Sequence, residues 1–226
     1  MRVLPRILID TAIVPEGGEL RLFRRGAEFS IMLGANELMN SRLSGSEEAL
    51  AVRACERLRD APRPRLLIGG LGMGFTLRAA LAALGTEAEV TVAELVPAVV
   101  AWARGPMAAI FAGCLEDRRV RVVEEDVAGQ IAGAASAWDA ILLDVDNGPD
   151  GLSRAGNGRL YGPAGLAAAR RALRPAGVLA IWSAAPDRAF ARRLDEAGFA
   201  VEEMVVRARA GGRGARHVIW LATKTA

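Results

Sequence analysis

Three glycines at a spacing of two are the first residues of this sequence that could do chemistry. Gly70, Gly72 and Gly74 lie in LLIGGLGMGFTLR (66–78), between an apolar run typical of a buried strand and a segment typical of a helix. Backbone without Cβ atoms would let a nucleoside or a carboxylate approach the amino end of that helix closely. Glycines at a tight turn also serve packing between a helix and a strand, so this motif alone leaves both interpretations open.

Acidic residues follow the next two apolar runs at the points where those runs end. Glu94 and Leu95 end the run EVTVAEL, and an acidic residue there can accept hydrogen bonds from both hydroxyls of a ribose. The same charge would repel a 2′-phosphate. Asp126 ends the run RVRVVEED and Val127 follows it, so the carboxylate could meet an adenine amino group beside the Val127 backbone.

A fourth apolar run, WDAILLDVD, ends in a cluster of polar residues. Asp144, Asp146 and Asn147 lie within four positions of one another. Polar groups at the mouth of a buried strand are costly unless they bind a ligand or one another. Because the carboxyl ends of parallel strands meet at one edge of a sheet, four consecutive strand ends direct polar groups at one cleft. This convergence indicates a nucleoside-binding site more strongly than any one motif.

The elements that must position these residues alternate between strand and helix from residue 65 onward. This alternation predicts an α/β fold with a doubly wound, mostly parallel, Rossmann-like sheet covered by helices on both faces. The last two apolar runs, 200–209 and 216–224, are joined by a short loop and predict an antiparallel hairpin at one edge of that sheet.

Residues 1–45 differ in pattern and predict a small β-hairpin appendage before a catalytic domain of residues 46–226. Apolar residues alternate between positions 20 and 33, around a turn at Arg24-Arg25-Gly26. A helix over 44–59 follows, which Ser44 or Ser46 can cap. The segment NELMN (36–40) is either a wall of the cleft or a plain connecting loop.

Composition excludes several classes of function. The net charge is +3 with scattered arginines, and the run at 207–216 is more typical of a solvated hairpin than of a phosphate-binding patch, so no nucleic acid partner is expected. The pattern predicts no membrane span and a cytoplasmic protein. The two cysteines, Cys55 and Cys114, and the single histidine, His217, indicate buried free thiols, no metal site and no Ser-His-Asp triad.

The order of these motifs resembles the spermidine synthases (aminopropyltransferases), within the class I S-adenosylmethionine-dependent methyltransferase fold. The resemblance covers about residues 60–185. It is carried by GLGMGFTLR (70–78), Glu94, DRRV (117–120), Asp126, WDAILLDVDNG (138–148), LY (160–161) and LRPAG (173–177).

The resemblance implies a role for each matching position. Asp144 corresponds to the family's base that deprotonates the attacking amine, with Asp146 as the second candidate. Asp146, Asn147 and Tyr161 are expected to bind the acceptor substrate. The residues expected to bind the adenosyl donor are Gly70, Gly72, Gly74, Glu94, Leu95, Asp126, Val127 and Asp144.

Three departures from the family pattern fall on the amine side of the site. Met73 stands where the family has an aspartate that holds the aminoalkyl end of the donor. Asn147 replaces a second aspartate, although Asp146 is adjacent. The family's Tyr-His-Glu run falls near 46–48, where this chain lacks the Tyr and the His. The nucleoside half of the site is therefore expected to be intact and the amine half to be rebuilt.

These observations leave several functions open. The first is aminopropyl transfer to an amine from decarboxylated S-adenosylmethionine, and the second is methyl transfer from S-adenosylmethionine to an unknown acceptor. In both, the donor is a substrate, the partner is a small molecule and no metal takes part. A non-catalytic relative that binds a nucleoside is the alternative from another class, and an NAD-dependent oxidoreductase fits least well. The family also implies a homodimer.

Overall fold

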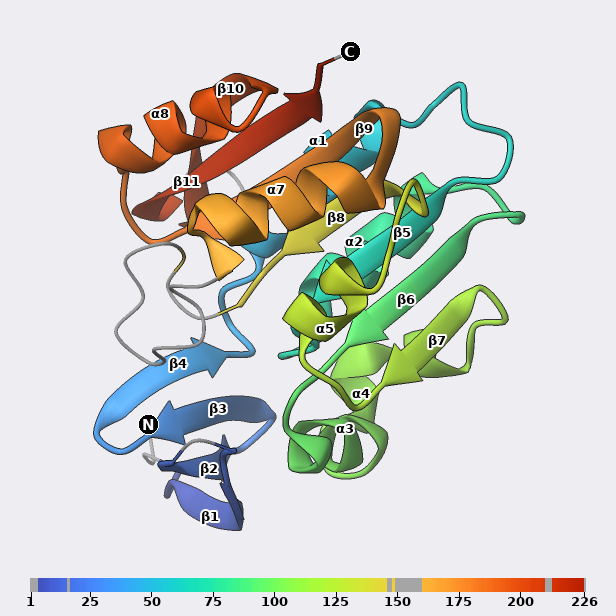
Figure 1. The fold of residues 1–226 in the computed structure, drawn as a ribbon. Coiled ribbons are helices and arrows are strands. Elements are labelled where there is room, and N and C mark those ends of the chain that lie inside the picture. Colours follow the sequence, from blue (N-terminus) through green and yellow to red (C-terminus); the bar gives the residue numbers. More distant parts are fainter. Residues whose placement is uncertain (1–3, 16, 146–147, 149–159, 210–212, 226) are drawn as a thin grey trace.

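The computed structural model describes residues 4–15, 17–145, 148, 160–209 and 213–225. Its strands form one sheet of seven strands and one sheet of four strands. Figure 1 shows the four-stranded sheet beside one end of the larger sheet, close to α3 (Pro97–Arg104). None of the helices in these ranges combines the length and the apolar character needed to cross a bilayer.

The seven-stranded sheet has the order β10-β11-β9-β8-β5-β6-β7. The pairs from β9 through β8, β5 and β6 to β7 are parallel, and β11 pairs antiparallel with both β9 and β10. This arrangement confirms the predicted mostly parallel sheet and its antiparallel edge hairpin. The strands are β5 (Arg65–Gly69), β6 (Glu89–Ala93), β7 (Val120–Val123), β8 (Trp138–Leu143), β9 (Leu173–Ser183), β10 (Phe199–Arg209) and β11 (Arg213–Lys224).

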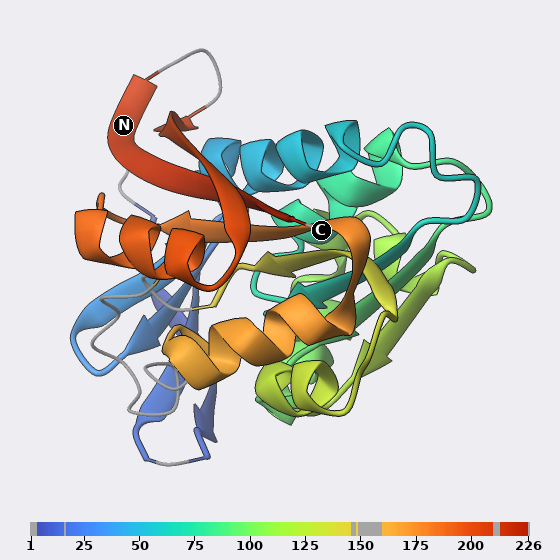
Figure 2. The same ribbon diagram turned by 45° about the horizontal axis from the view of Figure 1, so that its top comes forward.

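Helices cover both faces of this sheet, as Figure 2 shows. One face packs against α1, α2 and α3, and the other packs against α5, α7 and α8. The strand β5 is apolar throughout because Leu66 and Ile68 enter the first core cluster while Leu67 enters the second. Besides α3, the helices are α1 (Gly45–Glu56), α2 (Phe75–Ala83), α4 (Ala108–Phe111), α5 (Val127–Ala132), α7 (Pro163–Ala172), α8 (Arg188–Glu196) and the 3₁₀ helix η1 (Cys114–Glu116).

The beginning of α1 differs from the sequence prediction. Ser44 is the N-cap residue, but its side chain makes no capping hydrogen bond. Ser46 lies inside the first turn, where its hydroxyl donates to the Glu47 carboxylate at 2.6 Å. Neither serine therefore caps the helix through its side chain. The hydroxyl of the buried Ser46 is hydrogen-bonded to Glu47 instead.

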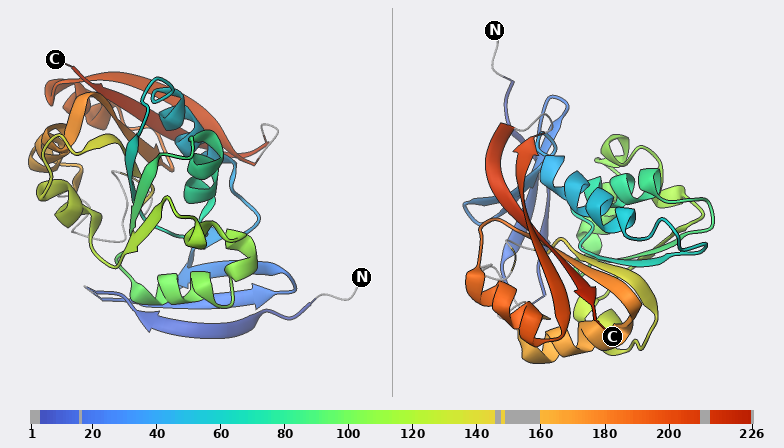
Figure 3. Two further views of the ribbon diagram at one scale, coloured as in Figure 1. Left: turned by 90° about the vertical axis from the view of Figure 1, so that its right-hand side faces the viewer. Right: turned by 90° about the horizontal axis from the view of Figure 1, so that it is seen from above.

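The four-stranded sheet is a simple antiparallel meander of β1 (Ile7–Ile13), β2 (Glu19–Arg25), β3 (Glu28–Leu33) and β4 (Asn36–Asn40). Leu22 opposes Ile31, which confirms the predicted hairpin over 20–33. The segment 36–40 is the fourth strand and not a connecting loop. Figure 3 shows this sheet alongside α3, and Trp102 Nε1 donates to Asp10 Oδ2 at 2.7 Å between them. The domain boundary at residue 45 stays a prediction.

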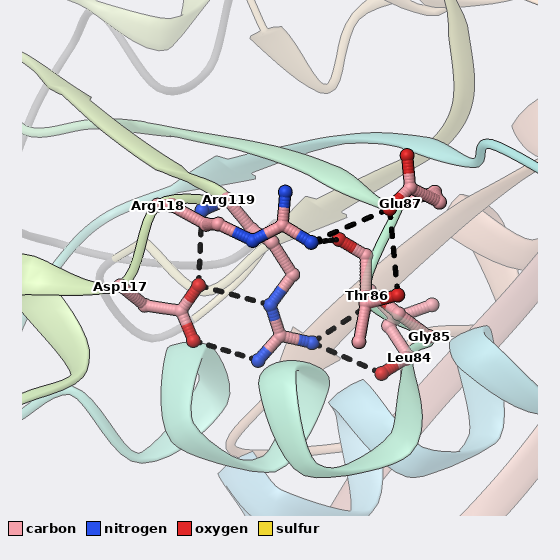
Figure 4. A network of polar contacts seen from close by, with 7 residues as sticks. All are labelled: Leu84, Gly85, Thr86, Glu87, Asp117, Arg118 and Arg119. Carbon is pink, nitrogen blue, oxygen red and sulfur yellow. Dashed lines mark hydrogen bonds and ion pairs between the residues drawn. The ribbon is translucent and has the colours of Figure 1, made fainter.

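The run 117–120 forms a hydrogen-bonded turn at the amino ends of β6 and β7. Arg119 makes a bidentate contact with Asp117, and its Nη1 atom donates to the Leu84 carbonyl oxygen at 3.0 Å (Figure 4). The same Nη1 atom donates to the Leu81 carbonyl oxygen at 3.0 Å. The Arg119 guanidinium lowers the pKa of Asp117 to about 2. This network satisfies the last carbonyls of α2 and positions β7, at the opposite end of the sheet from the polar strand ends.

Candidate active site

A pocket opens at the carboxyl ends of β5, β6, β7 and β8, where doubly wound sheets bind ligands. We call it the glycine-loop pocket. Its wall toward the four-stranded sheet is apolar and includes Leu20, Ile31 and Leu38. The residues predicted from the sequence that line it are Gly70, Gly72, Glu94, Leu95, Asp126, Val127 and Asp144. The structure therefore brings the polar ends of four strands to one cavity.

The glycines of the loop have different tasks. A Cβ atom on Gly70, whose φ is +89°, would lie 2.5 Å from the Asp144 carbonyl oxygen, so the bare backbone lets β5 and β8 end side by side. Gly72 faces Met39 and lines the pocket. Gly74 is not among the described lining residues, and a Cβ atom there would lie 2.5 Å from the Phe111 ring. Gly74 thus has a packing role, and its part in donor binding stays a prediction.

Glu94 connects the glycine loop to the end of β6. Its Oε2 atom accepts the backbone N–H of Leu71 and its Oε1 atom accepts that of Val96, each at 2.9 Å. The side chain is buried, and burial raises its pKa while these backbone hydrogen bonds lower it. Each carboxylate oxygen has a further lone pair, so a bound hydroxyl group can still donate to Glu94.

Asp126 caps α5, and Val127 packs against Gly69 at the start of the glycine loop. The Asp126 Oδ1 atom accepts the Ala128 backbone N–H at 2.8 Å, while the side chain remains exposed at the rim of the pocket. Val127 is buried, and a Cβ atom on Gly69 would lie only 2.9 Å from one of its methyl carbons. One carboxylate oxygen of Asp126 is therefore engaged in the fold, and the other is directed at no described hydrogen-bond donor.

A second pocket adjoins the first at Gly72, Leu38, Met39 and Asp144. We call it the acidic pocket, because Glu47 and Asp144 both line it. Thr76 lies beneath, and its hydroxyl donates to Asp144 Oδ2 at 2.6 Å. The remaining lining residues are apolar or aromatic and comprise Leu71, Met73, Phe75 and Trp182.

The two carboxyl groups of the acidic pocket hold protons more readily than free side chains do. Burial raises the pKa of Asp144 to about 7, and the nearby Glu47 carboxylate adds to this rise, whereas the Thr76 hydrogen bond opposes it. Burial also raises the pKa of Glu47. A carboxyl group with a pKa near 7 can take up a proton from a substrate at neutral pH, which is the property a general base requires.

Of the three expected acceptor-binding residues, the structure describes only Tyr161. Asp146 and Asn147 lie outside the described residues, so their roles stay predictions. Tyr161 is buried in the second core cluster and packs edge-on against Phe190, with ring centroids 5.7 Å apart. It is not a described lining residue of either pocket. Met73 does line the acidic pocket, where it brings a thioether in place of a carboxylate.

Sequence reasoning missed several residues of the acidic pocket. Glu47 falls near the family's Tyr-His-Glu run, but the sequence assigned it no role in the site, because acidic residues are also typical of the first turn of a helix. Trp182 lies at the end of β9 and carries no motif. Within the described ranges, no group of three or more His, Cys, Asp and Glu side chains could hold a metal ion, and Cys55 and Cys114 are buried free thiols.

Comparison with known proteins agrees with this geometry. No protein-family model matches the chain. A protein of Mycobacterium tuberculosis named polyamine aminopropyltransferase is 37% identical over 130 residues, which cover 56% of this chain and 24% of that protein. Polyamine aminopropyltransferase 1 of Streptomyces coelicolor is 32% identical over 153 residues, covering 64% and 28%. The chain thus spans about a quarter of the length of these relatives.

Solved structures align with more of this chain than the curated relatives do. Spermidine synthase from Thermotoga maritima aligns with a TM-score of 0.75 over 96% of this chain and 72% of that one, at 18% identity. A spermidine synthase in complex with the transition state analogue AdoDATO aligns with a TM-score of 0.74 at 17% identity. The chain is similar in fold to the spermidine synthases. For this spermidine synthase-like chain, the predicted resemblance and the predicted fold are both confirmed.

Proposed function

We propose that this spermidine synthase-like chain transfers the aminopropyl group of decarboxylated S-adenosylmethionine to an amine. The observation that carries the proposal is the position of Asp144, which lines both pockets at the point where they meet. A donor in the glycine-loop pocket and an acceptor in the acidic pocket would thus meet beside a carboxylate with a pKa of about 7. The names of the curated relatives support the same chemistry.

The adenosine part of the donor suits the glycine-loop pocket. Glu94 has lone pairs left for the ribose hydroxyls, and Asp126 with the Val127 backbone offers acceptor and donor groups to an adenine edge. The buried negative charge of Glu94 disfavours a 2′-phosphate, which separates this donor from a phosphorylated dinucleotide. These assignments keep the donor-binding set proposed from the sequence, in which Gly74 also packs against Phe111.

The reaction is a direct displacement beside a positive sulfur. The lone pair of the amine nitrogen forms a bond to the methylene carbon next to the sulfonium, and the C–S bond breaks with its electron pair going to sulfur. Methylthioadenosine leaves, and the nitrogen loses one proton to the Asp144 carboxylate. The protein contributes positioning of the two substrates and removal of this proton.

The acidic pocket suits an ammonium group. Glu47 and Asp144 replace part of the water that a cation gives up when it is buried. Asp146, Asn147 and Tyr161 stay proposed acceptor residues on the strength of the resemblance alone. Met73 favours a second candidate, methyl transfer from S-adenosylmethionine, because it removes a carboxylate that could pair with the amine of the decarboxylated donor.

Mass spectrometry with each donor separately tests the proposal. One reaction contains decarboxylated S-adenosylmethionine with a mixture of diamines and polyamines, and the other contains S-adenosylmethionine with a metabolite extract. We expect methylthioadenosine in the first reaction and its loss in Asp144→Asn. S-adenosylhomocysteine in the second reaction alone would favour methyl transfer, and two intact donors would favour a relative that binds without reacting.

A homodimer in the cytoplasm completes the proposal. The strand β1 forms the edge of the small sheet and exposes Ile7, Leu8 and Ile13, which are 48%, 49% and 74% exposed. An exposed apolar edge strand is a favourable surface for pairing with a second copy. The buried free thiols suit a reducing compartment. Light scattering that reports a monomer would contradict the dimer.

A further inference from the structure

His217 is the single histidine of the chain, and it adjoins the acidic pocket from behind. Its Nδ1 atom lies 2.8 Å from Ser46 Oγ, and Ser46 Oγ lies 2.6 Å from Glu47 Oε2. The imidazole packs edge-on against Trp182, with ring centroids 4.7 Å apart. Because Trp182 and Glu47 both line the acidic pocket, His217 contacts one lining residue directly and reaches the other through Ser46.

The fold explains this position. In the antiparallel pair of β9 and β11, Trp182 opposes Ile219. His217 precedes Ile219 by two residues and so lies on the same face of the sheet, diagonal to Trp182. That face is the one that α1 covers, with Ser46 in its first turn. The ring is therefore held between the sheet and the start of the helix that carries Glu47.

Counting protons gives the hydrogen-bond chain one direction. Ser46 is fully buried and has a single hydroxyl proton. An ionised Glu47 can only accept, so Ser46 donates to it. Ser46 Oγ can then offer His217 only a lone pair, and Nδ1 must carry the proton that it donates. When Glu47 is ionised, the chain runs from His217 through Ser46 to Glu47.

We propose that His217 is a positioning residue, which acts through Ser46 to hold the Glu47 carboxylate ionised and oriented for the ammonium group of the acceptor. The orientation matters because a free glutamate loses rotamer freedom when it binds a cation, and a side chain that is already ordered avoids this loss. The proposal rests on the proposed function in one respect, that the acceptor is an amine.

The tautomer of His217 tests the hydrogen-bond chain without any need for activity. Because the chain has one histidine, its imidazole nitrogens give a single set of NMR signals in the ¹⁵N-labelled protein. At alkaline pH, where Glu47 is ionised, we expect the proton on Nδ1 in the wild type. A proton on Nε2 under these conditions would overturn the proposal, whether or not the protein catalyses a reaction.

Two substitutions at His217 separate positioning from packing. His217→Asn keeps an N–H donor near the place of Nδ1 and loses the ring, whereas His217→Phe keeps a ring against Trp182 and loses the donor. With 1,4-diaminobutane as the acceptor probe, we expect His217→Phe to raise KM about tenfold with kcat within about twofold. We expect the KM of His217→Asn to stay within about threefold of the wild type.

The opposite order, with His217→Phe close to the wild type and His217→Asn impaired, would mean that the ring only packs and would overturn the proposal. Thermal unfolding of both variants checks that each is folded at the assay temperature. If the wild type transfers nothing to the probe, that result counts against the proposed function, and the tautomer measurement alone decides the role of His217.

Discussion

The pKa of Asp144 makes the pH dependence of the reaction a sharp test of its role. With a pKa of about 7, about a tenth of these carboxyl groups are ionised at pH 6 and about nine tenths at pH 8. A base that must be ionised therefore raises kcat/KM for the amine about tenfold between these two values. An aspartate at its ordinary pKa would be ionised throughout this range and would contribute no change.

Two neighbours of Asp144 give matched controls for this inflection. Glu47→Gln removes a negative charge that raises the pKa of Asp144, so the inflection moves to lower pH. Thr76→Val removes a hydrogen bond that lowers this pKa, so the inflection moves to higher pH. The amine substrate loses its own proton in the same way in every variant. A difference in pH between the inflections of the two variants therefore reports a change in the pKa of Asp144.

The assay is the initial rate of methylthioadenosine formation at saturating donor between about pH 5.5 and pH 9, with the amine well below its KM. Under these conditions kcat/KM for the amine reports the ionisation of the enzyme–donor complex before the amine binds. Asp144→Asn is expected to lower kcat by about a hundredfold to ten-thousandfold. Inflections that coincide in Glu47→Gln, Thr76→Val and the wild type would refute the assignment of Asp144 as the base.

Three further predictions concern stability and affinity. The folded-state pKa of Asp144 lies above its ordinary 3.8, so ionisation destabilises the fold as the pH rises from about 4 to about 7. Asp144→Asn should therefore raise the free energy of unfolding in urea by on the order of 4 kcal/mol more at pH 8 than at pH 4, and an equal change at both would contradict this. Gly74→Ala forces a Cβ atom against Phe111 at a positive φ, which should destabilise the fold by about 2–3 kcal/mol and lower the melting temperature. An unchanged melting temperature would show that the loop shifts to make room for the Cβ atom. Glu94→Gln replaces one carboxylate oxygen by an amide N–H and should weaken methylthioadenosine binding at least about tenfold by calorimetry, whereas unchanged affinity would remove Glu94 from the site.

The main sheet and the donor side of the site could be predicted because their signals are local. The apolar run of β5 and the proline that begins α3 each carry their own pattern. The polar ends of β5, β6, β7 and β8 needed only the rule that parallel strands end at one edge. Glu94, Asp126 and Asp144 therefore line one pocket as predicted.

The acceptor side could not be predicted because its contacts join distant parts of the chain. His217 and Ser46 are 171 positions apart and meet only because α1 covers the antiparallel edge hairpin. Gly74 has the sequence context of a ligand loop, yet the residue that requires it is Phe111, at the end of a four-residue helix with no clear pattern. For residues 36–40 the sequence left a pocket wall and a connecting loop as alternatives, because the segment is short and polar at both ends. Its pairing with β3 makes it the strand β4 and a pocket wall.

Transfer of an isotopic label tests the central claim most directly. The propyl carbons of decarboxylated S-adenosylmethionine carry the label, and mass spectrometry follows it in the presence of 1,4-diaminobutane. We predict that the label moves to the amine, with one methylthioadenosine formed for each labelled amine, and that Asp144→Asn loses both products together. A label that stays on an intact donor across a range of diamines, or methylthioadenosine formed without a labelled amine, would contradict aminopropyl transfer by this chain.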